Sequence, residues 1–371
     1  EEAGPRLTYR DIDILSTRLA RHFALLGVRK GDVVSFQLPT WWEFSVLHLA
    51  CLKLGAISNP LLTILREREL RFMLDQSKAR IFVVPSMFRG FDYAAMARSL
   101  REKLSALEHI FVVDGQGYER FGRLLEEEPS TETQILAGVA PDDVIQLLYT
   151  SGTTGKPKGV MHSSNTMLSN LYPFAARLCL NEADIIHMPS PMGHQLGFMY
   201  GMVLPVMLGG TAVLQDIFDP AAMSRQVIGE SATFTMGATP FLNDFVEEIA
   251  RSGLDTPSLR TFVSAGAPIP RALVARARAV LDVSVISGWG MSENGAVTTT
   301  RPDDAEDLVT NTDGCALPGM EVQVRGADGA QVRPGDSGEL MVRGCSNFLG
   351  YFERPDLSAL DDEGWFDTGD I

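Results

Sequence analysis

The chain has 371 residues, 45% of them hydrophobic and 21% charged, an ordinary composition for a globular protein with a large buried core. The length favours two or three structural units. A net charge of −15 argues against nucleic acid or an anionic membrane surface as the main partner. Four scattered cysteines without C-x-x-C spacing are expected to be reduced core thiols, and the lack of an export leader favours a cytoplasmic location.

The first part of the chain alternates between helical and strand patterns. Apolar residues recur at helical spacing over 12–26, and a strand predicted at 33–36 precedes a helix predicted at 41–53. Two further strands are predicted at 79–85 and 109–114. This alternation predicts a mostly parallel sheet covered by helices.

Residues 149–160, with the sequence YTSGTTGKPKGV, have a composition suited to wrapping oligophosphate. Residues 150–159 hold four hydroxyl side chains, three glycines and two lysines. Small residues let backbone N–H groups approach an anion, hydroxyls add donors and lysines supply positive charge. A predicted buried strand at 144–149 precedes the loop and a predicted helix at 163–171 follows it, which is the usual setting of a phosphate site.

Two other interpretations of this segment compete with a phosphate loop. A Walker A loop would need a glycine where Thr150 stands, and Pro157 follows Lys156 where that motif has serine or threonine. A flexible linker would suit the composition alone, but linkers seldom lie between an apolar strand and a helix. The phosphate-binding interpretation is therefore preferred.

The second part of the chain repeats the alternation and then changes pattern. Strands are predicted at 184–188, 211–214, 233–235 and 261–264, with helices at 220–229 and 271–281 between them, as in a second doubly wound unit. The uncharged run 192–214 contains Pro205 and five glycines, so a transmembrane segment is not expected there. From about residue 300, short strands and glycine turns predict a small antiparallel barrel.

Seven further motifs, in order along the chain, accompany the loop. They are LTYR at 7–10, LGA to NP at 54–60, PMGHQLG at 191–197, SAGAP at 264–268, GWGMSE at 288–293, GELMVRG at 338–344 followed by GY at 350–351, and DTGD at 367–370. Together they resemble the adenylate-forming superfamily, which comprises acyl-CoA synthetases, the adenylation domains of peptide synthetases and beetle luciferases. The resemblance covers essentially the whole chain.

The resemblance implies an α/β fold with two interleaved doubly wound subdomains and a small antiparallel β-barrel. It assigns 46–181 to the first subdomain with the phosphate loop, 1–45 and 182–298 to the second, and 299–371 to the barrel. Family members continue through a hinge into a mobile C-terminal domain that completes thiol transfer. Because this sequence stops at Ile371, that domain is expected to be absent and the second step impaired.

The resemblance also implies the reaction and its cofactors. A carboxylic acid attacks ATP to give an acyl-AMP and pyrophosphate, and CoA then takes the acyl group as a thioester. Thr150, Lys158, Ser292 and Glu293 are the implied catalytic residues, and Glu293 with Thr150 would hold Mg²⁺. A solvated loop acid is the other interpretation of Glu293.

The implied nucleotide site surrounds these residues. Trp289 stands where the family usually has the tyrosine that stacks on adenine, although a core tryptophan is the alternative. Asp370 would accept hydrogen bonds from the ribose hydroxyls. The remaining implied ATP contacts are Ser151, Gly152, Thr153, Thr154, Gly155, Lys156, Ala265, Gly266, Ala267, Pro268, Gly288, Gly290 and Met291.

The acid is expected to be a fatty or alicyclic carboxylate of short to medium length. Residues 191–197 lack the aspartate that pairs with the ammonium of an amino acid, and Gly290 stands where acetate-activating relatives carry a tryptophan. The candidate lining is mostly apolar. For Phe198, Met199 and Met236, the competing interpretation is that they belong to the ordinary core. For His194, the competing interpretation is an interior histidine with satisfied hydrogen bonds. The candidates are His194, Gln195, Phe198, Met199, Met236, Gly237, Ala238, Gly266 and Gly290.

Two other functions stay open at this point. An adenylation domain that loads a carrier protein would share every motif, because CoA and a carrier present the same thiol. A truncated module that binds nucleotide or acyl-adenylate without turnover would also fit, although it would be expected to lose one of Lys156, Lys158, Glu293 or Asp370. The expected partners are the acid, ATP and CoA, with a homodimer possible.

Overall fold

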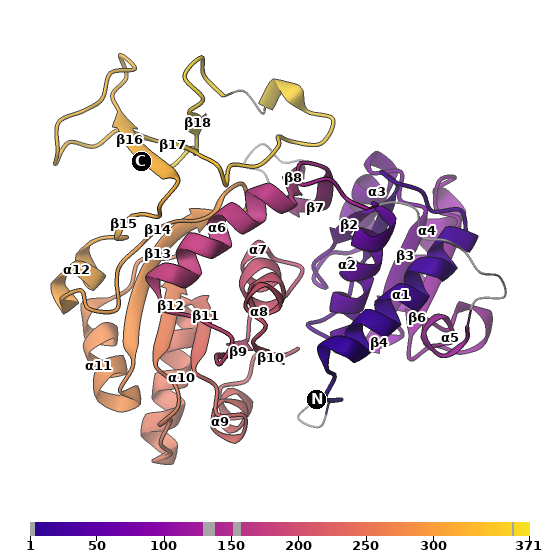
Figure 1. The fold of residues 1–371 in the computed structure, drawn as a ribbon, viewed down its shortest axis with the longest axis horizontal. Helices are drawn as coiled ribbons and strands as arrows, with labels where there is room; N and C mark the ends of the chain where they lie inside the picture. The colour runs from indigo at the N-terminus through magenta and orange to yellow at the C-terminus, as the bar shows by residue number, and fades with distance from the viewer. Residues whose placement is uncertain (1–3, 129–137, 151–156, 358–359) are drawn as a thin grey trace. The chain divides into compact units, whose positions relative to one another are not determined.

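The structure is a computed structural model that describes residues 4–128, 138–150, 157–357 and 360–371 (Figure 1). The chain divides into two compact units. Unit 1 comprises residues 1–164 and 191–194, and unit 2 comprises residues 165–190 and 195–371. The parallel sheets, covering helices and small antiparallel sheets confirm the predicted α/β class.

Unit 1 is built on a six-stranded sheet in the order β6-β3-β1-β2-β7-β8. The strands are β1 (Val33–Phe36), β2 (Ile57–Pro60), β3 (Ile81–Pro85), β6 (His109–Val113), β7 (Val144–Thr150) and β8 (Lys158–Ser163), and a small hairpin is formed by β4 (Met87–Phe88) and β5 (Phe91–Asp92). All neighbours in the sheet are parallel except β7 and β8. The predicted strands of the first part of the chain are thus confirmed.

The helices of unit 1 begin and end at recognisable signals. They are α1 (Tyr9–Leu25), α2 (Trp42–Leu54), α3 (Glu67–Gln76), α4 (Tyr93–Lys103) and α5 (Arg123–Glu126). Thr8 and Asp11 form a capping box at the start of α1, and Gly55 ends α2 in the left-handed conformation with φ +70°. The T-shaped pair of Phe36 and Phe44, with ring centroids 4.8 Å apart, packs α2 against β1.

A strand that was not predicted, β8, lies between the phosphate loop and the predicted helix. Thr150 pairs with Lys158 and Tyr149 with Gly159, so the loop joins two antiparallel strands. The helix predicted at 163–171 is confirmed as α6 (Ser164–Arg177), but the strand β8 between the loop and this helix was not predicted. Val160 is buried in this strand, where it gains more from sheet packing than from a helix start.

Unit 2 is built on a seven-stranded sheet in the order β10-β9-β11-β12-β13-β14-β15. The strands are β9 (Ile185–Met188), β10 (Thr211–Leu214), β11 (Phe234–Ala238), β12 (Thr261–Ala265), β13 (Ser284–Met291), β14 (Gly295–Thr299) and β15 (Cys315–Ala316). The first five strands in this order are parallel, and β14 and β15 continue the sheet in antiparallel fashion. The predicted second parallel unit is confirmed.

Helices cover this sheet and enclose an apolar core. Besides α6 they are α7 (Gln195–Phe198), α8 (Leu204–Leu208), α9 (Pro220–Gly229), α10 (Thr239–Ser252), α11 (Arg271–Leu281) and α12 (Glu306–Asn311). Phe245 of α10, Val274 of α11 and Phe262 of β12 are fully buried in one cluster. The uncharged run 192–214 is broken into short elements, and no described helix is long and apolar enough to cross a bilayer.

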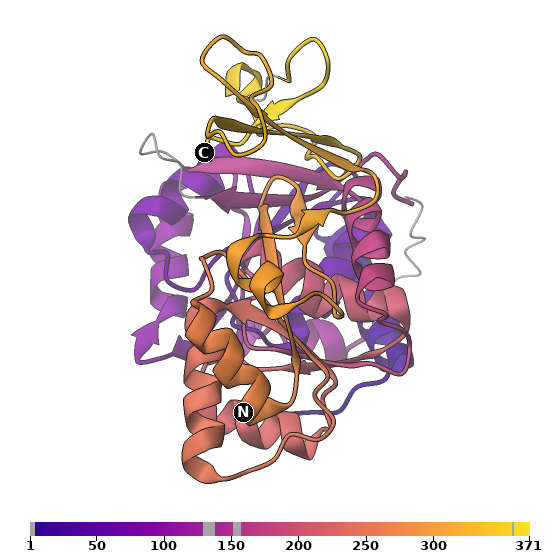
Figure 2. The same cartoon turned by 90° about the vertical axis from the view of Figure 1, so that its left-hand side faces the viewer.

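The last part of the chain forms a three-stranded antiparallel sheet of β16 (Met320–Arg325), β17 (Glu339–Gly344) and β18 (Phe366–Asp367). Figures 1 and 2 show these orange and yellow strands as an open layer. The predicted change to short antiparallel strands is confirmed, but a closed barrel is not formed by the described residues. Three strands, one of them two residues long, are too few to close.

The division into units differs from the predicted one, because residues 1–45 and 191–194 belong to unit 1 and residues 165–181 and 299–371 belong to unit 2. Residues 1–45 were assigned to the second subdomain, yet β1 lies between β2 and β3 in the sheet of unit 1. The parallel pairing of β1 with β2 is made by the short crossover through α2. Residues 165–181, expected in the first subdomain, belong to unit 2.

The cysteines depart from the expectation of core thiols. All four are free, as expected, but only Cys51 is buried. Cys179 follows α6 with φ +55°, Cys315 lies on the two-residue strand β15, and Cys345 follows β17. Turns and short edge strands leave these three side chains exposed.

A buried histidine should make unit 2 sensitive to acid. His187 on β9 is fully buried, its Nε2 lies 3.1 Å from Oε1 of Gln226, and burial lowers its pKa to about 4 from 6.5. In the unfolded chain His187 is therefore protonated below about pH 6.5, whereas in the folded chain it is protonated only below about pH 4. Stability is fully present above pH 6.5 and lost as the pH falls.

We expect His187→Gln to remove this pH dependence. Between pH 7 and pH 5, the unfolding free energy of the parent chain should fall by about 2 kcal/mol more than that of the variant. Urea unfolding at the two pH values measures this difference, and the other histidines, shared by both chains, cancel. Equal slopes for the two chains would contradict the assignment.

Candidate active site

The ends of three neighbouring parallel strands bring three groups of candidate site residues together. Ala238 of β11 stands beside Ala265 of β12, which stands beside Gly288 of β13. These are the carboxyl ends of the strands, where ligands of open α/β sheets usually bind. The sheet thus brings together the candidate acid pocket (236–238), the candidate adenine loop (265–268) and the GWGMSE motif.

Small residues keep the backbone open at this edge. Gly266 follows β12 with φ +84°, a conformation that favours glycine, and a side-chain carbon there would meet no atom within 4 Å. Ala267 and Pro268 are exposed beside it. The loop 265–268 therefore presents accessible backbone next to the end of β13, as a base-binding surface requires.

A β-bulge in β13 shapes the GWGMSE motif. The register with β14 shifts between Trp289 and Gly290. A side-chain carbon on Gly290 would overlap the carbonyl oxygen of Gly295 and lie 2.8 Å from Cα of Ala296. The backbone of the β13–β14 hairpin thus requires glycine at 290. The sequence had suggested another reason for this glycine, namely an open acid pocket.

Trp289 and Asp370 are brought together although 81 residues separate them. The indole Nε1 of Trp289 donates a hydrogen bond of 2.9 Å to Oδ2 of Asp370. Trp289 is half-buried and Asp370 is exposed. Both predicted nucleoside contacts therefore lie at one place in unit 2, and the alternative of a core tryptophan is not what the structure shows.

Glu293 is a buried carboxylate with a defined partner. It is 5% exposed, and the hydroxyl of Tyr351 donates a 2.6 Å hydrogen bond to its Oε1. Burial and the neighbouring carboxylate raise the pKa of Tyr351 far above its usual value, so this phenol stays a donor. The interpretation of Glu293 as a solvated loop acid is therefore wrong.

The donor set around Glu293 suits a shared magnesium ion. Mg²⁺ bound with a nucleotide usually takes one or two carboxylates, with phosphate oxygens and water as its other ligands. No cluster of three or more His, Cys, Asp or Glu side chains that could hold a metal occurs in the described part of the chain. A single buried carboxylate fits an ion that arrives with phosphate and does not fit a resident all-protein site.

A buried network behind the motif was missed from the sequence. Nδ2 of Asn170 donates to the carbonyls of Asn294 (3.1 Å) and Ala296 (2.6 Å), and the Tyr200 hydroxyl donates to Oδ1 of Asn170 (2.8 Å). The Ala296 N–H in turn donates to that hydroxyl at 2.7 Å. The network joins α6 and the π-helical turn Met199–Val203 to β14, and so holds the hairpin that carries Glu293.

Removing the Tyr200 hydroxyl should destabilise unit 2. Tyr200→Phe would leave the Ala296 N–H and Oδ1 of Asn170 without this partner in a buried site. Each unmet buried group costs about 1–3 kcal/mol, so we expect a loss of about 2–4 kcal/mol in unfolding free energy by urea denaturation. The matched control is Tyr172→Phe, since Tyr172 on α6 is 60% exposed, and it should change stability by less than about 0.5 kcal/mol. Equal effects would disprove the network's role.

The candidate acid-lining residues divide into two groups. Phe198, Met199 and Met236 are each 3% exposed or less, which agrees equally with pocket lining and with plain core. Gln195 is 3% exposed, and neither polar atom of its amide has a hydrogen-bond partner among the described residues. His194 belongs to unit 1, and its side chain is exposed.

The phosphate-loop predictions are only partly visible. Thr150 and Lys158 are the antiparallel pair that closes the β7–β8 hairpin, and both are half-buried. The predicted contacts Ser151, Gly152, Thr153, Thr154, Gly155 and Lys156 lie outside the described residues.

Comparison with known proteins identifies the family. The profile described as "AMP-binding enzyme" matches residues 2–352. The chain belongs to the AMP-binding enzyme family. Among curated proteins, this AMP-binding enzyme is 35% identical to the medium-chain fatty-acid–CoA ligase of Escherichia coli K12 over 372 aligned positions, which cover 99% of this chain and 66% of that relative. It thus spans about two thirds of that relative's length.

Solved structures with the same fold include the N-terminal domain of FACL13 and an anthranilate–CoA ligase. The inhibitor-bound N-terminal domain of FACL13 from Mycobacterium tuberculosis superposes with a TM-score of 0.88 at 28% identity, over 99% of this AMP-binding enzyme and 89% of that chain. The anthranilate–CoA ligase AuaEII in complex with anthranoyl-AMP gives a TM-score of 0.89 at 25% identity, over 99% and 70% of the two chains.

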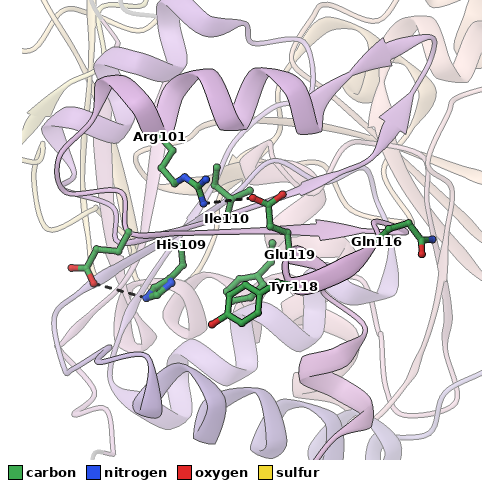
Figure 3. Close-up of a pocket in the computed structure, with 8 residues that line it drawn as sticks. Arg101, His109, Ile110, Gln116, Tyr118 and Glu119 are labelled. Carbon is green, nitrogen blue, oxygen red and sulfur yellow. Dashed lines mark ion pairs between the residues drawn. The ribbon is translucent and has the colours of Figure 1, made fainter.

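One cavity of this AMP-binding enzyme has none of the predicted site residues in its lining. It has a volume of about 510 Å³ and is lined by residues of α4, β6 and the turn after β6 (Figure 3). Arg101 pairs there with Glu119 at 3.5 Å, and His109 lies 3.9 Å from Glu108. β6 is the edge strand opposite the β7–β8 hairpin. The two acidic residues of the cavity also pair with Arg80 and Arg98, which lie outside its lining, and we assign the cavity no role in the reaction.

Proposed function

We propose that this AMP-binding enzyme activates a carboxylic acid with ATP to give an acyl-adenylate and pyrophosphate, and that CoA then accepts the acyl group as a thioester. The observation that carries the proposal is the alignment of Ala238, Ala265 and Gly288 at one sheet edge, with Trp289 and Asp370 joined beside it. Its relatives that are named acid–CoA ligases support the same reaction.

The chemistry asks the protein mainly to position charged groups. A carboxylate is a poor electrophile, and converting it to an acyl phosphate ester gives it a good leaving group. Its oxygen attacks the α-phosphorus of ATP in line, the bond to pyrophosphate breaks, and the protein holds both partners in place. Mg²⁺, when bound with ATP, would neutralise charge on the phosphates.

Each group of residues has a role in this proposal. Trp289 would stack on adenine, with the backbone of 265–268 along the base, and Asp370 would accept from the ribose hydroxyls. Glu293 would hold the magnesium ion. The hydrogen bond from the Tyr351 hydroxyl would fix the position of the Glu293 carboxylate. Ser292 would donate its hydroxyl to the α-phosphate, and Thr150 and Lys158 with the loop 151–156 would bind the β and γ phosphates.

The acid is proposed to be a medium-chain fatty or alicyclic carboxylate. Met199 and Met236 are flexible, apolar and buried, and would suit an aliphatic chain better than a charged one. The ligase of Escherichia coli is named for medium-chain fatty acids, which supports this class. A cytoplasmic location is proposed with it, because ATP and CoA are supplied there.

Pyrophosphate release dependent on the acid tests this function. We would assay acetate through dodecanoate, cyclohexanecarboxylate, benzoate and several amino acids with Mg-ATP, and detect acyl-AMP by mass spectrometry. Medium-chain or alicyclic acids should give the highest release, with no release from amino acids. CoA and a phosphopantetheine carrier would then be offered as acceptors. ATP binding with no release for any acid would instead favour a binding module without turnover.

A further inference from the structure

We infer that Trp289 is a positioning residue for the ribose-binding carboxylate, in addition to its proposed stacking role. The inference rests on the proposed function, and its basis is the 2.9 Å hydrogen bond from the indole Nε1 to Oδ2 of Asp370. A phenylalanine at 289 would offer the same kind of ring face but no such donor. The role is therefore a property of this chain's own tryptophan.

Hydrogen bonds hold the backbone of Asp370 in place, so the orientation of its carboxylate depends on the side-chain torsion angles. The Leu340 N–H donates to the Asp370 carbonyl at 2.8 Å, and the Asp370 N–H donates to Oγ1 of Thr368 at 3.1 Å. Thr368 donates in turn to the Leu340 carbonyl at 2.7 Å. These contacts attach the residue to β17. Among the described residues, Trp289 is the one partner of the carboxylate group itself.

Trp289 is well placed to hold that carboxylate. It lies in the sheet, on β13 opposite Thr298 of β14, so its backbone is restrained by the ladder on that side. An exposed aspartate without a partner would sample several rotamers and would lose that freedom on binding ribose. A carboxylate that already points toward the nucleoside avoids part of this cost.

The geometry of the bond leaves room for both parts of a nucleoside. An indole N–H lies in the plane of its ring, so Asp370 lies off the ring edge and its hydrogen bond occupies neither ring face. A carboxylate has about four acceptor positions, and the indole uses one of them. Oδ1 and the second lone pair of Oδ2 can still accept from two hydroxyls. The bond therefore orients the acceptor without blocking it.

A double-mutant cycle tests the inference by direct binding. Affinities for ATP, 2′-deoxy-ATP and 3′-deoxy-ATP would be measured by calorimetry for the parent chain, Trp289→Phe, Asp370→Ala and the double variant. In Trp289→Phe we expect ATP to bind about fivefold more weakly, while the deoxy analogues lose less, because the lost bond acts through the carboxylate. In the Asp370→Ala background the same change should cost less than about twofold.

Further variants and controls distinguish the positioning role of Trp289 from its stacking role, and distinguish failure of this inference from failure of the proposed function. Trp289→Leu, which loses the ring as well, should weaken all three nucleotides further and by a common additional factor. Thermal unfolding would verify that every variant is folded. Additive effects in the cycle, or equal losses for ATP and both analogues in Trp289→Phe, would overturn the positioning role while ATP binding by the parent chain kept the proposed function intact. A parent chain that binds no ATP would overturn both.

Discussion

Gly290→Ala is expected to disrupt the active-site hairpin more than any other single methyl addition in this motif. The new carbon would overlap the Gly295 carbonyl oxygen, and the neighbour that must move is backbone, not a flexible side chain. Overpacking of this kind costs about 1–3 kcal/mol. We expect urea unfolding to show a loss near the upper end of that range, and acid-dependent pyrophosphate release to fall at least tenfold, because Trp289 and Glu293 flank the displaced bulge.

Gly288→Ala is the matched control, two residues earlier in the same strand. There the nearest atom to a new carbon is the Thr298 carbonyl oxygen at 3.5 Å, an ordinary contact. We expect this variant to lose less than about 1 kcal/mol. If both alanine variants were equally stable, the bulge would not be the reason for glycine at 290, and a role in opening the acid pocket would become the better explanation.

Glu293→Gln is expected to reduce the turnover of pyrophosphate release by about 100-fold or more, with little change in stability. The amide keeps the shape and can still accept from the Tyr351 hydroxyl, but it lacks the charge that a hard cation prefers. Charge stabilisation of a transition state is commonly worth a factor of about 10²–10³. Turnover measured against Mg²⁺ concentration should also show that the variant needs more metal to reach half its maximal rate.

Tyr351→Phe separates the charge from its positioning. This variant keeps the carboxylate and removes only the donor, so we expect a loss of less than about tenfold in turnover. Turnover of Glu293→Gln within threefold of the parent would exclude Glu293 as the metal-associated residue. A loss in Tyr351→Phe as large as that in Glu293→Gln would mean that the hydrogen bond, not the charge, matters most.

The sequence predicted the parallel units well because their signals are local. Buried apolar strands such as 81–85 and 109–113 repeat at regular intervals with helical patterns between them, and the structure places them within a residue or two of the prediction. The β8 strand was missed because the apolar run after the loop is short, and short apolar runs do not distinguish strand from helix. The exposed cysteines were missed because turn position, not residue type, decides their burial.

The candidate site was predictable as motifs and not as contacts. Ala238, Ala265 and Gly288 become neighbours only through the register of three strands. The spacing of these residues in the sequence does not predict that register. The Asn170–Tyr200 network joins residues up to 126 positions apart, and neither belongs to a motif singled out from the sequence. Polar residues buried at helix–strand contacts carry no periodic signal, so they emerge only from packing.

The β13–β14 hairpin has a consequence for how acid specificity can diverge in this lineage. Within five consecutive positions it carries the ring at 289, the obligatory glycine at 290 and the buried carboxylate at 293. A substitution that enlarges or narrows the pocket from this side would alter nucleotide and metal contacts in the same step. At the end of β11 and in the short helices after β9, the candidate acid-lining residues Met236 and Met199 have no proposed contact with nucleotide or metal. Selection for a new acid should therefore act first at positions such as Met236 and Met199, and leave the hairpin unchanged.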